Sequence, residues 1–265
     1  MFTKTTALVA FMAGLALPHA AGAQSDTQDL AAADSAAREI LAGMTDYLAG
    51  LDTVSFDFEV SLEAVTTAGV KLQFPASGSM LLDRPEKFRV SRTGAHSDIL
   101  LNSDGETLTL YGRRIGTYAQ QAAPASLDAF VENAHEHGIA MPGADLLITT
   151  VAEELSEPIT KALYLGSGPV GGVECEHLAF RTDDVDFQLW VAVGDKPYPC
   201  RYVVTSKWLA AAPQYQLQIA NWNDAPEIAD GAFVFEAPAD AGKADLAELP
   251  DLDILMPEST EGMKR

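Results

Sequence analysis

The stretch that decides the fold class is Val54-Ser-Phe56-Asp-Phe58-Glu-Val60-Ser-Leu62. Its apolar residues occupy every second position and polar residues lie between them, which is the pattern of a β-strand with one buried face. Further short runs with turn signals between them follow at 70–74, 78–82, 88–92, 98–101 and 107–111. This regular spacing favours a meandering antiparallel sheet over alternating strand–helix units.

Strands are predicted again in the second half of the chain. They begin at Leu163 and continue to Phe235, with clear antiparallel runs at 173–180, 185–193 and 201–206. In the middle run one face carries Phe187, Leu189, Val191 and Val193, and the other carries Asp186, Gln188, Trp190 and Ala192. An ordinary filled core and a hydrophobic cavity enclosed by a curved sheet both fit this pattern.

Three helical segments accompany the strands. Apolar residues at helical spacing predict a helix from Asp34 to Ala49, and the Ala- and Gln-rich segment 24–33 before it is expected to be frayed. A second apolar face, ended by Gly138, follows Pro124, and residues 144–155 predict a third helix. The two later helices either plug the open end of the sheet or separate two small domains. We favour the plug, because neither half has enough strands to close a core alone.

The N-terminal residues 1–23 have the features of a cleavable export signal. Lys4 precedes an apolar run, and Ala21-Gly-Ala23 supplies the small-x-small cleavage site. The residue after the cut is Gln24 and not Cys, so no lipid anchor is signalled, and the apolar run is too short to span a bilayer. We therefore expect a periplasmic protein without stable membrane insertion.

Charge and composition narrow the partners. The chain has 17 Lys and Arg against 38 Asp and Glu, a formal net charge of −21, so it repels phosphate backbones and excludes nucleic acid as a partner. With 48% hydrophobic residues, this acidity coexists with a real core. We expect one domain over 24–238 and an acidic, mobile tail over 239–265.

The two cysteines, Cys175 and Cys200, are a candidate disulfide, because pairing is the usual state in an oxidising compartment. They fall on the outer two of three successive predicted strands. In a flat sheet that spacing is roughly 9 to 10 Å, which is too far for a disulfide. Pairing therefore requires the 194–199 turn to fold back, and two buried free thiols are the alternative.

Three short motifs resemble catalytic or metal sites without their structural context. The string Gly166-Ser-Gly168-Pro-Val-Gly171 is followed by a predicted strand and not by a helix, so it indicates a hairpin turn. His135 and His137 are two apart on a helix and point about 200° apart, so they cannot share a metal. His177 lies on a strand face with Cys175, the usual position of a core histidine. We therefore expect no metal, no cofactor and no enzymatic activity.

A longer resemblance is carried by two blocks, Ser79-Met-Leu-Leu-Asp-Arg84-Pro-Glu-Lys-Phe88 and Ser103-Asp-Gly105-Glu-Thr-Leu. They resemble the periplasmic lipoprotein carriers of the LolA family, as do Tyr215-Gln-Leu and Phe233-Val-Phe235-Glu-Ala-Pro238. Cys175-Glu-His177-Leu-Ala-Phe180, Asp186-Phe-Gln-Leu-Trp190 and Pro197-Tyr-Pro-Cys200 are similar to a related family of predicted periplasmic proteins, the domain of unknown function 2092. The insertion 124–155 and the cysteine pair have no counterpart in the carriers.

The resemblance implies a mainly antiparallel α+β fold: a LolA-like incomplete, half-open β-barrel with an N-terminal helix and inserted lid helices over a hydrophobic cavity. It further implies that Arg84 hydrogen-bonds to the lid and holds the empty cavity closed. The residues we expect to line the cavity are Phe56, Phe58, Phe88, Leu108, Leu110, Phe130, Phe187, Leu189, Trp190 and Trp222.

These features predict a carrier or sensor of acyl-chain-bearing ligands, lipid or lipoprotein, that exchanges them with membrane-bound donor and acceptor proteins. The alternative is a structural or interaction module of the cell envelope whose barrel is filled. A hydrolase would need a nucleophile and a base within hydrogen-bond reach in a cleft, and the sequence offers no candidate pair.

Overall fold

The computed structural model describes residues 21–95, 98–137, 141, 143–156 and 159–246. Their strands form one 12-stranded sheet in the order β12-β6-β5-β4-β3-β2-β1-β11-β10-β9-β8-β7. The strands are β1 Thr53–Val65, β2 Lys71–Asp83, β3 Lys87–Gly94, β4 Asp98–Asp104, β5 Thr107–Gly112, β6 Thr117–Ala122, β7 Lys161–Val170, β8 Val173–Arg181, β9 Val185–Ala192, β10 Pro199–Ser206, β11 Gln214–Asn223 and β12 Gly242–Lys243. Every neighbouring pair is antiparallel except β12 with β6.

The sheet is open, since its outermost strands β7 and β12 do not pair with each other. The predicted fold class, a mainly antiparallel α+β fold built on an incomplete barrel, is confirmed. One strand is longer than its sequence suggested, because β2 runs through Pro75 where we expected two separate runs. Proline has no backbone N–H to donate to a neighbouring strand. Pro75 lies just beyond Ala76 and Gly94, the last pair between β2 and β3, where β2 no longer has to donate to β3.

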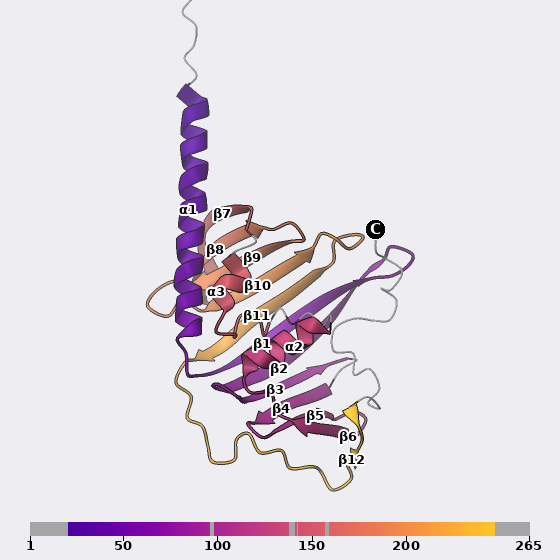
Figure 1. The fold of residues 1–265 in the computed structure, drawn as a ribbon. Coiled ribbons are helices and arrows are strands. Elements are labelled where there is room, and N and C mark those ends of the chain that lie inside the picture. Colours follow the sequence, from indigo (N-terminus) through magenta and orange to yellow (C-terminus); the bar gives the residue numbers. More distant parts are fainter. Residues whose placement is uncertain (1–20, 96–97, 138–140, 142, 157–158, 247–265) are drawn as a thin grey trace, which may run out of the picture.

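Three helices lie against one face of this sheet: α1 Ala21–Ala49, α2 Leu127–Glu136 and α3 Val151–Ser156. Figure 1 shows α1 along the β7 side of the sheet, with α3 and α2 in front of the middle strands. We call this the helix-covered face. The core between helices and sheet contains fully buried side chains from both layers, including Leu41, Met44 and Leu48 of α1 and Val54 and Leu82 of the sheet.

Two helix boundaries differ from those predicted. The segment 24–33, expected to be frayed, is helical, because its Ala and Gln residues are good helix formers and no Pro interrupts it. The third helix is shorter than the predicted 144–155, and α3 begins only at Val151. The residues before it form turns that α2 holds in place, since Asp128 accepts hydrogen bonds from the backbone N–H (2.8 Å) and the hydroxyl of Thr149. α2 lies after Pro124 as predicted, and Ser126 is its N-cap, since its hydroxyl accepts a hydrogen bond from Ala129 N–H at 3.0 Å; the predicted end at Gly138 lies outside the described residues.

The C-terminal segment, residues 224–246, crosses the opposite face of the sheet. We predicted a strand up to Phe235, but the segment leaves the sheet after β11 and returns only at β12 beside β6 (Figure 1). It is held by Asn102, whose Nδ2 donates to the Phe233 carbonyl at 2.6 Å, and by Phe235, whose ring lies 5.6 Å from that of Tyr111. Residues 242–243 of the expected tail are therefore attached to the sheet, and 247–265 lie outside the described residues.

Two further findings concern the described ranges as a whole. None of their helices combines the length and the apolar character needed to cross a lipid bilayer. Within the same ranges, no group of three or more His, Cys, Asp and Glu side chains is arranged to hold a metal ion.

Candidate functional site

Most of the predicted cavity residues lie together on the helix-covered face. Those that belong to its core or pack against it are Phe56, Phe58, Phe88, Leu108, Phe130, Phe187, Leu189 and Trp222. Leu110 is half-buried and pairs with Leu101, which packs against the same core. The structure thus brings together side chains from β1, β3, β5, β9, β11 and α2.

Trp190 does not belong to this group. Its neighbours Leu189 and Val191 point into the core, and Trp190 lies on the opposite face, where its ring stacks on His177 with centroids 4.1 Å apart. The guanidinium of Arg201 lies 5.4 Å from the Trp190 ring centroid. The expectation that Trp190 lines the cavity was wrong, and the alternation of β9 already placed it with Gln188 on the outer face. His177, whose Nε2 is 3.0 Å from Gln188 Oε1, belongs to the same outer cluster.

Aromatic contacts join the helices to the sheet. The Phe130 ring of α2 lies 5.3 Å from Phe88 of β3, and the Trp222 ring stacks on Phe56 at 5.4 Å. The Trp222 indole N–H donates to the Tyr47 hydroxyl of α1 at 3.1 Å. Burial raises the pKa of Tyr47 to about 12, so this phenol stays neutral. Aromatic rings of β3 and β11 therefore contact α2 and α1, respectively.

Arg84 follows the last residue of β2 and connects two separate parts of the helical layer. Its Nη2 donates to the carbonyl of Leu48 near the end of α1 (3.4 Å) and to the carbonyl of Leu147 in the turns before α3. Burial lowers the pKa of Arg84, while the charges of Asp128 and Asp52 oppose that shift. Its Nε is buried and has no hydrogen-bond partner among the described residues. Arg84 thus ties α1 and the turns before α3 to the end of a core strand.

We define the lid as α2, residues 143–150 and α3. Besides Arg84, two polar contacts hold the lid together: Asp128 with Thr149, and His135 Nε2 with Asp145 Oδ1 at 3.1 Å. Burial raises the pKa of Asp145 to about 6, and the neighbouring His135 partly offsets this. The sequence placed His135 correctly near the end of α2 but did not single out Asp128 or Asp145. Their partners lie 21 and 10 residues away along the chain, beyond the reach of local spacing rules.

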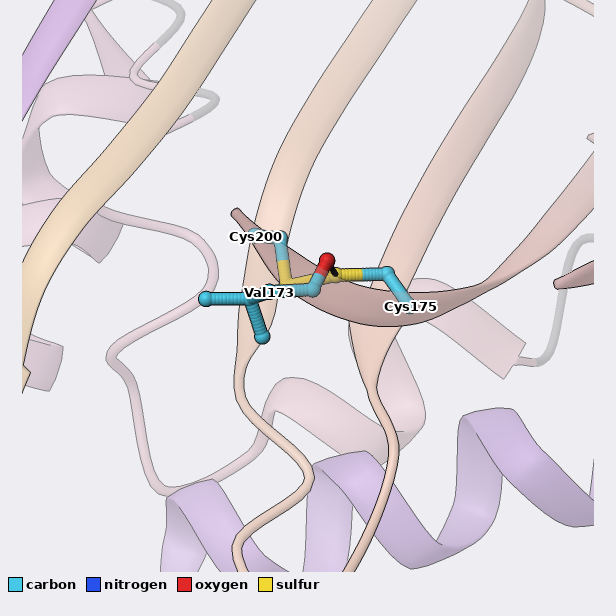
Figure 2. The surroundings of a disulfide bond; sticks show 3 residues. All are labelled: Val173, Cys175 and Cys200. Atoms are coloured by element: carbon cyan, nitrogen blue, oxygen red, sulfur yellow. Dashed lines mark hydrogen bonds between the residues drawn. A yellow bond between two sulfur atoms is a disulfide. The ribbon is translucent and has the colours of Figure 1, made fainter. Parts of the chain in front are cut away.

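A disulfide bond joins Cys175 of β8 to Cys200 of β10 across β9 (Figure 2). The two Cα atoms are 7.0 Å apart, closer than a flat sheet would place them. The register between β9 and β10 shifts between Pro199 and Arg201, so Cys200 lies at an irregularity of this strand pair and not in a flat, regular sheet. The disulfide lies in a small buried cluster with Ala192, separate from the main core.

The Gly166–Gly171 string forms the end of β7 and the turn into β8, which is a strand. Gly166, Gly171 and Gly172 have positive φ angles of 96°, 59° and 87°. The string therefore shapes a hairpin, and no helix follows it to receive a phosphate.

The family model for predicted periplasmic proteins, DUF2092, matches residues 37–247. The chain belongs to this family. Its periplasmic description agrees with the export signal predicted at the N-terminus, although residues 1–20 lie outside the described residues and cleavage after Ala23 stays a prediction. No curated protein matches the chain by sequence.

Several solved structures align with most of this chain, each with a TM-score below 0.5. LprF from Mycobacterium bovis aligns with a TM-score of 0.43 at 13% identity, covering 78% of this chain and 98% of that one. The lipoprotein LppX from Mycobacterium tuberculosis aligns with a TM-score of 0.40 at 10% identity, covering 74% and 100%. A LolA superfamily protein from Nitrosomonas europaea aligns with a TM-score of 0.35 at 12% identity, covering 75% and 97%. These similarities are too distant to transfer a ligand or a partner.

Proposed function

We propose that this periplasmic protein binds an acyl-chain-bearing ligand, a lipid or the acyl part of a lipoprotein, on the helix-covered face of its sheet, as a carrier or sensor. The proposal includes no catalytic step. Each methylene buried there would contribute ~0.8 kcal/mol, so one long chain binds usefully without a specific polar contact. The lining residues Phe88, Phe130 and Leu189 are of the apolar kind that such a chain requires.

The observation that carries the proposal is the attachment of the lid by Arg84. Burying a guanidinium whose Nε has no hydrogen-bond partner among the described residues is costly, because that group loses its water without full compensation. A polar tie of this kind suits a lid that opens, because in the open state water solvates the cation and the carbonyls again. Arg84 is thus assigned the role of a latch between Leu48 and Leu147.

Opening would expose the aromatic surface under α2 and let an acyl chain replace the contacts of the lid. Closing would restore the Arg84 hydrogen bonds and push the chain out toward an acceptor. Exchange with membrane-bound donor and acceptor proteins completes the proposal, because a soluble carrier must take its ligand from one membrane site and deliver it to another.

A second candidate function is an interaction module whose barrel is permanently filled. The observation that favours it is the packing of the described core, where Met44, Leu82 and Val151 are completely buried. If the lid never opens, the acidic surface would be the functional part of the molecule.

Tryptophan quenching tests the binding face directly, because the chain has three Trp residues. One variant keeps only Trp222, on the helix-covered face, through Trp190→Phe and Trp208→Phe. Its matched control keeps only Trp190, on the outer face, through Trp222→Phe and Trp208→Phe. A brominated fatty acid, which quenches only at contact, should quench the first variant saturably and leave the second unchanged.

The unbrominated acid provides the blank, and circular dichroism verifies that both variants fold. Native mass spectrometry of protein from an exporting host should also show co-purified lipid. Absence of saturable quenching together with a clean apo mass would favour the filled module, and equal quenching of both variants would place the ligand elsewhere.

A further inference from the structure

A group of polar side chains lies inside the otherwise apolar helix-covered face, where the lid meets β10 and β11. Tyr202 and Tyr215 point to this face, because they alternate with residues of the outer face and pair with Leu189 and Leu62. The Tyr215 hydroxyl reaches the lid: a Cβ on Gly143 would lie 3.0 Å from it. Asp145 of the lid and His135 of α2 complete the group. We call these four residues the polar cluster.

The hydrogen-bonding capacity of the polar cluster is only partly used. Asp145 Oδ1 is inaccessible to solvent and receives no well-aligned hydrogen bond from a described residue, although His135 Nε2 lies 3.1 Å away. The Tyr202 and Tyr215 hydroxyls lie near this carboxylate and make no hydrogen bond with another described residue, although Asp145 Oδ1 is the one atom of the cluster that is fully buried without a partner in the described ranges. Buried polar groups in proteins are nearly always paired, so the unpaired Asp145 Oδ1, with two phenols beside it, indicates a place for a further hydrogen-bond donor.

The charges around the polar cluster indicate which charge a bound partner can carry. Asp145 faces His135 of α2 and Glu154 of α3, and its charge also acts on Tyr202 and Tyr215. Arg92 of β3 acts on Tyr215. Burial raises the pKa of Asp145 only to about 6, so its carboxylate is mostly ionised at neutral pH. Burial raises the pKa of both phenols, which therefore stay neutral. Carboxylates accept hydrogen bonds, and two of them nearby disfavour an anionic guest.

We propose that the polar cluster holds the polar head of the bound amphiphile, and that this head is a hydrogen-bond donor, a hydroxyl or an amine, in preference to a carboxylate. This inference rests on the proposed function. The head would donate to Asp145 and exchange hydrogen bonds with the two phenols, while the chain extends over the apolar strand faces next to them. Leu189 and Leu217, which pair with Tyr202 on either side, begin that apolar path.

The test compares three amphiphiles with one labelled chain of about sixteen carbons that differ only in the head: carboxylate, hydroxyl or primary amine. Wild type at neutral pH should bind the hydroxyl and the amine about tenfold or more tighter than the carboxylate. Asp145→Asn should reduce the preference for the amine, and Tyr215→Phe, which keeps the ring, should reduce the preference for both donors. Asp230→Asn removes the same charge from the exposed C-terminal segment on the other face and should change neither ratio.

The readout is a ratio of affinities within one variant, so a general loss of affinity or stability cancels. Equal affinities for the three heads in wild type would overturn the inference while leaving the proposed function intact. The same holds if the ratios persist in both Asp145→Asn and Tyr215→Phe. If none of the three amphiphiles binds to wild type, the proposed function fails and the polar cluster has no head to hold.

Discussion

Replacing Arg84 by Leu should open the lid. The Leu147 carbonyl would lose its donor, whereas the Leu48 carbonyl keeps a second one, the Leu51 N–H at 3.3 Å. Losing a charged hydrogen bond costs about 1.5 to 3 kcal/mol, and removal of a partly unsatisfied buried cation returns some of that cost. A net change of about 1.5 kcal/mol would raise the open population about tenfold.

Hydrogen exchange measured by mass spectrometry over residues 143–156 reports this opening, and transfer of a labelled fatty acid to acceptor vesicles reports its consequence. Arg84→Leu should exchange faster there, load ligand readily and release it slowly, because closure would no longer expel the chain. Arg84→Lys should not restore closure fully, since an ammonium lacks the fork of donors that reaches two carbonyls. Arg114→Leu is the matched control: Arg114 also donates to two carbonyls, those of Ala95 and Gly94, but these lie at and just after the end of β3 and not in the lid. Exchange and transfer curves that overlay for all four proteins would refute the latch.

Two further changes test other parts of the structure. Replacing Cys175 and Cys200 by Ser opens a loop of 25 residues in sequence separation and should lower stability by about 3 to 4 kcal/mol, measured by urea unfolding, without changing the preference among ligand heads. A double variant as stable as wild type would show that the disulfide does not constrain the unfolded chain. The pKa of Asp145 is raised from 3.8 to about 6 in the folded protein. Its favourable contribution to folding stability is therefore present below pH 3.8 and is lost as the pH rises through 6. Asp145→Asn should therefore flatten the fall in stability between pH 4 and pH 7, by at most about 3 kcal/mol, and an unchanged pH profile would contradict the assigned burial.

The strands were predictable from sequence where alternation was regular, and less so where a tertiary contact decides. The pattern from Val54 to Leu62 lies in one strand, β1, because a buried face imposes a period of two. The end of the chain follows no such rule: Phe233 has a strand-like neighbourhood, yet its carbonyl is bound by Asn102, 131 residues earlier. No pattern within a short window contains that contact.

The candidate site also has parts that the sequence predicted and parts that depend on tertiary contacts. The apolar lining followed from alternation, with Trp190 assigned to the wrong face. Arg84 was proposed only through the family resemblance, since an Arg before Pro at a strand end is usually a surface residue. The polar cluster was missed altogether, because Asp145 and Tyr202 are 57 positions apart and meet only when the lid folds back on β10.

A tightly packed core does not by itself decide against a carrier, because the relevant comparison is between what the lid loses and what the ligand gains. The apolar residues that α2 buries are Leu127, Val131 and Ala134. At about 1.5 to 3 kcal/mol for each large side chain, undocking this helix costs several kcal/mol, to which the Arg84 tie adds about 1.5 to 3. A chain of about sixteen carbons gains on the order of 12 kcal/mol when it is fully buried, before the entropy of binding is subtracted. For α2 these sums are close enough for a ligand to displace the helix and for the helix to displace a ligand. Reversible exchange requires that balance, and a lid attached only by hydrophobic contacts would have no switchable tie with which to adjust it.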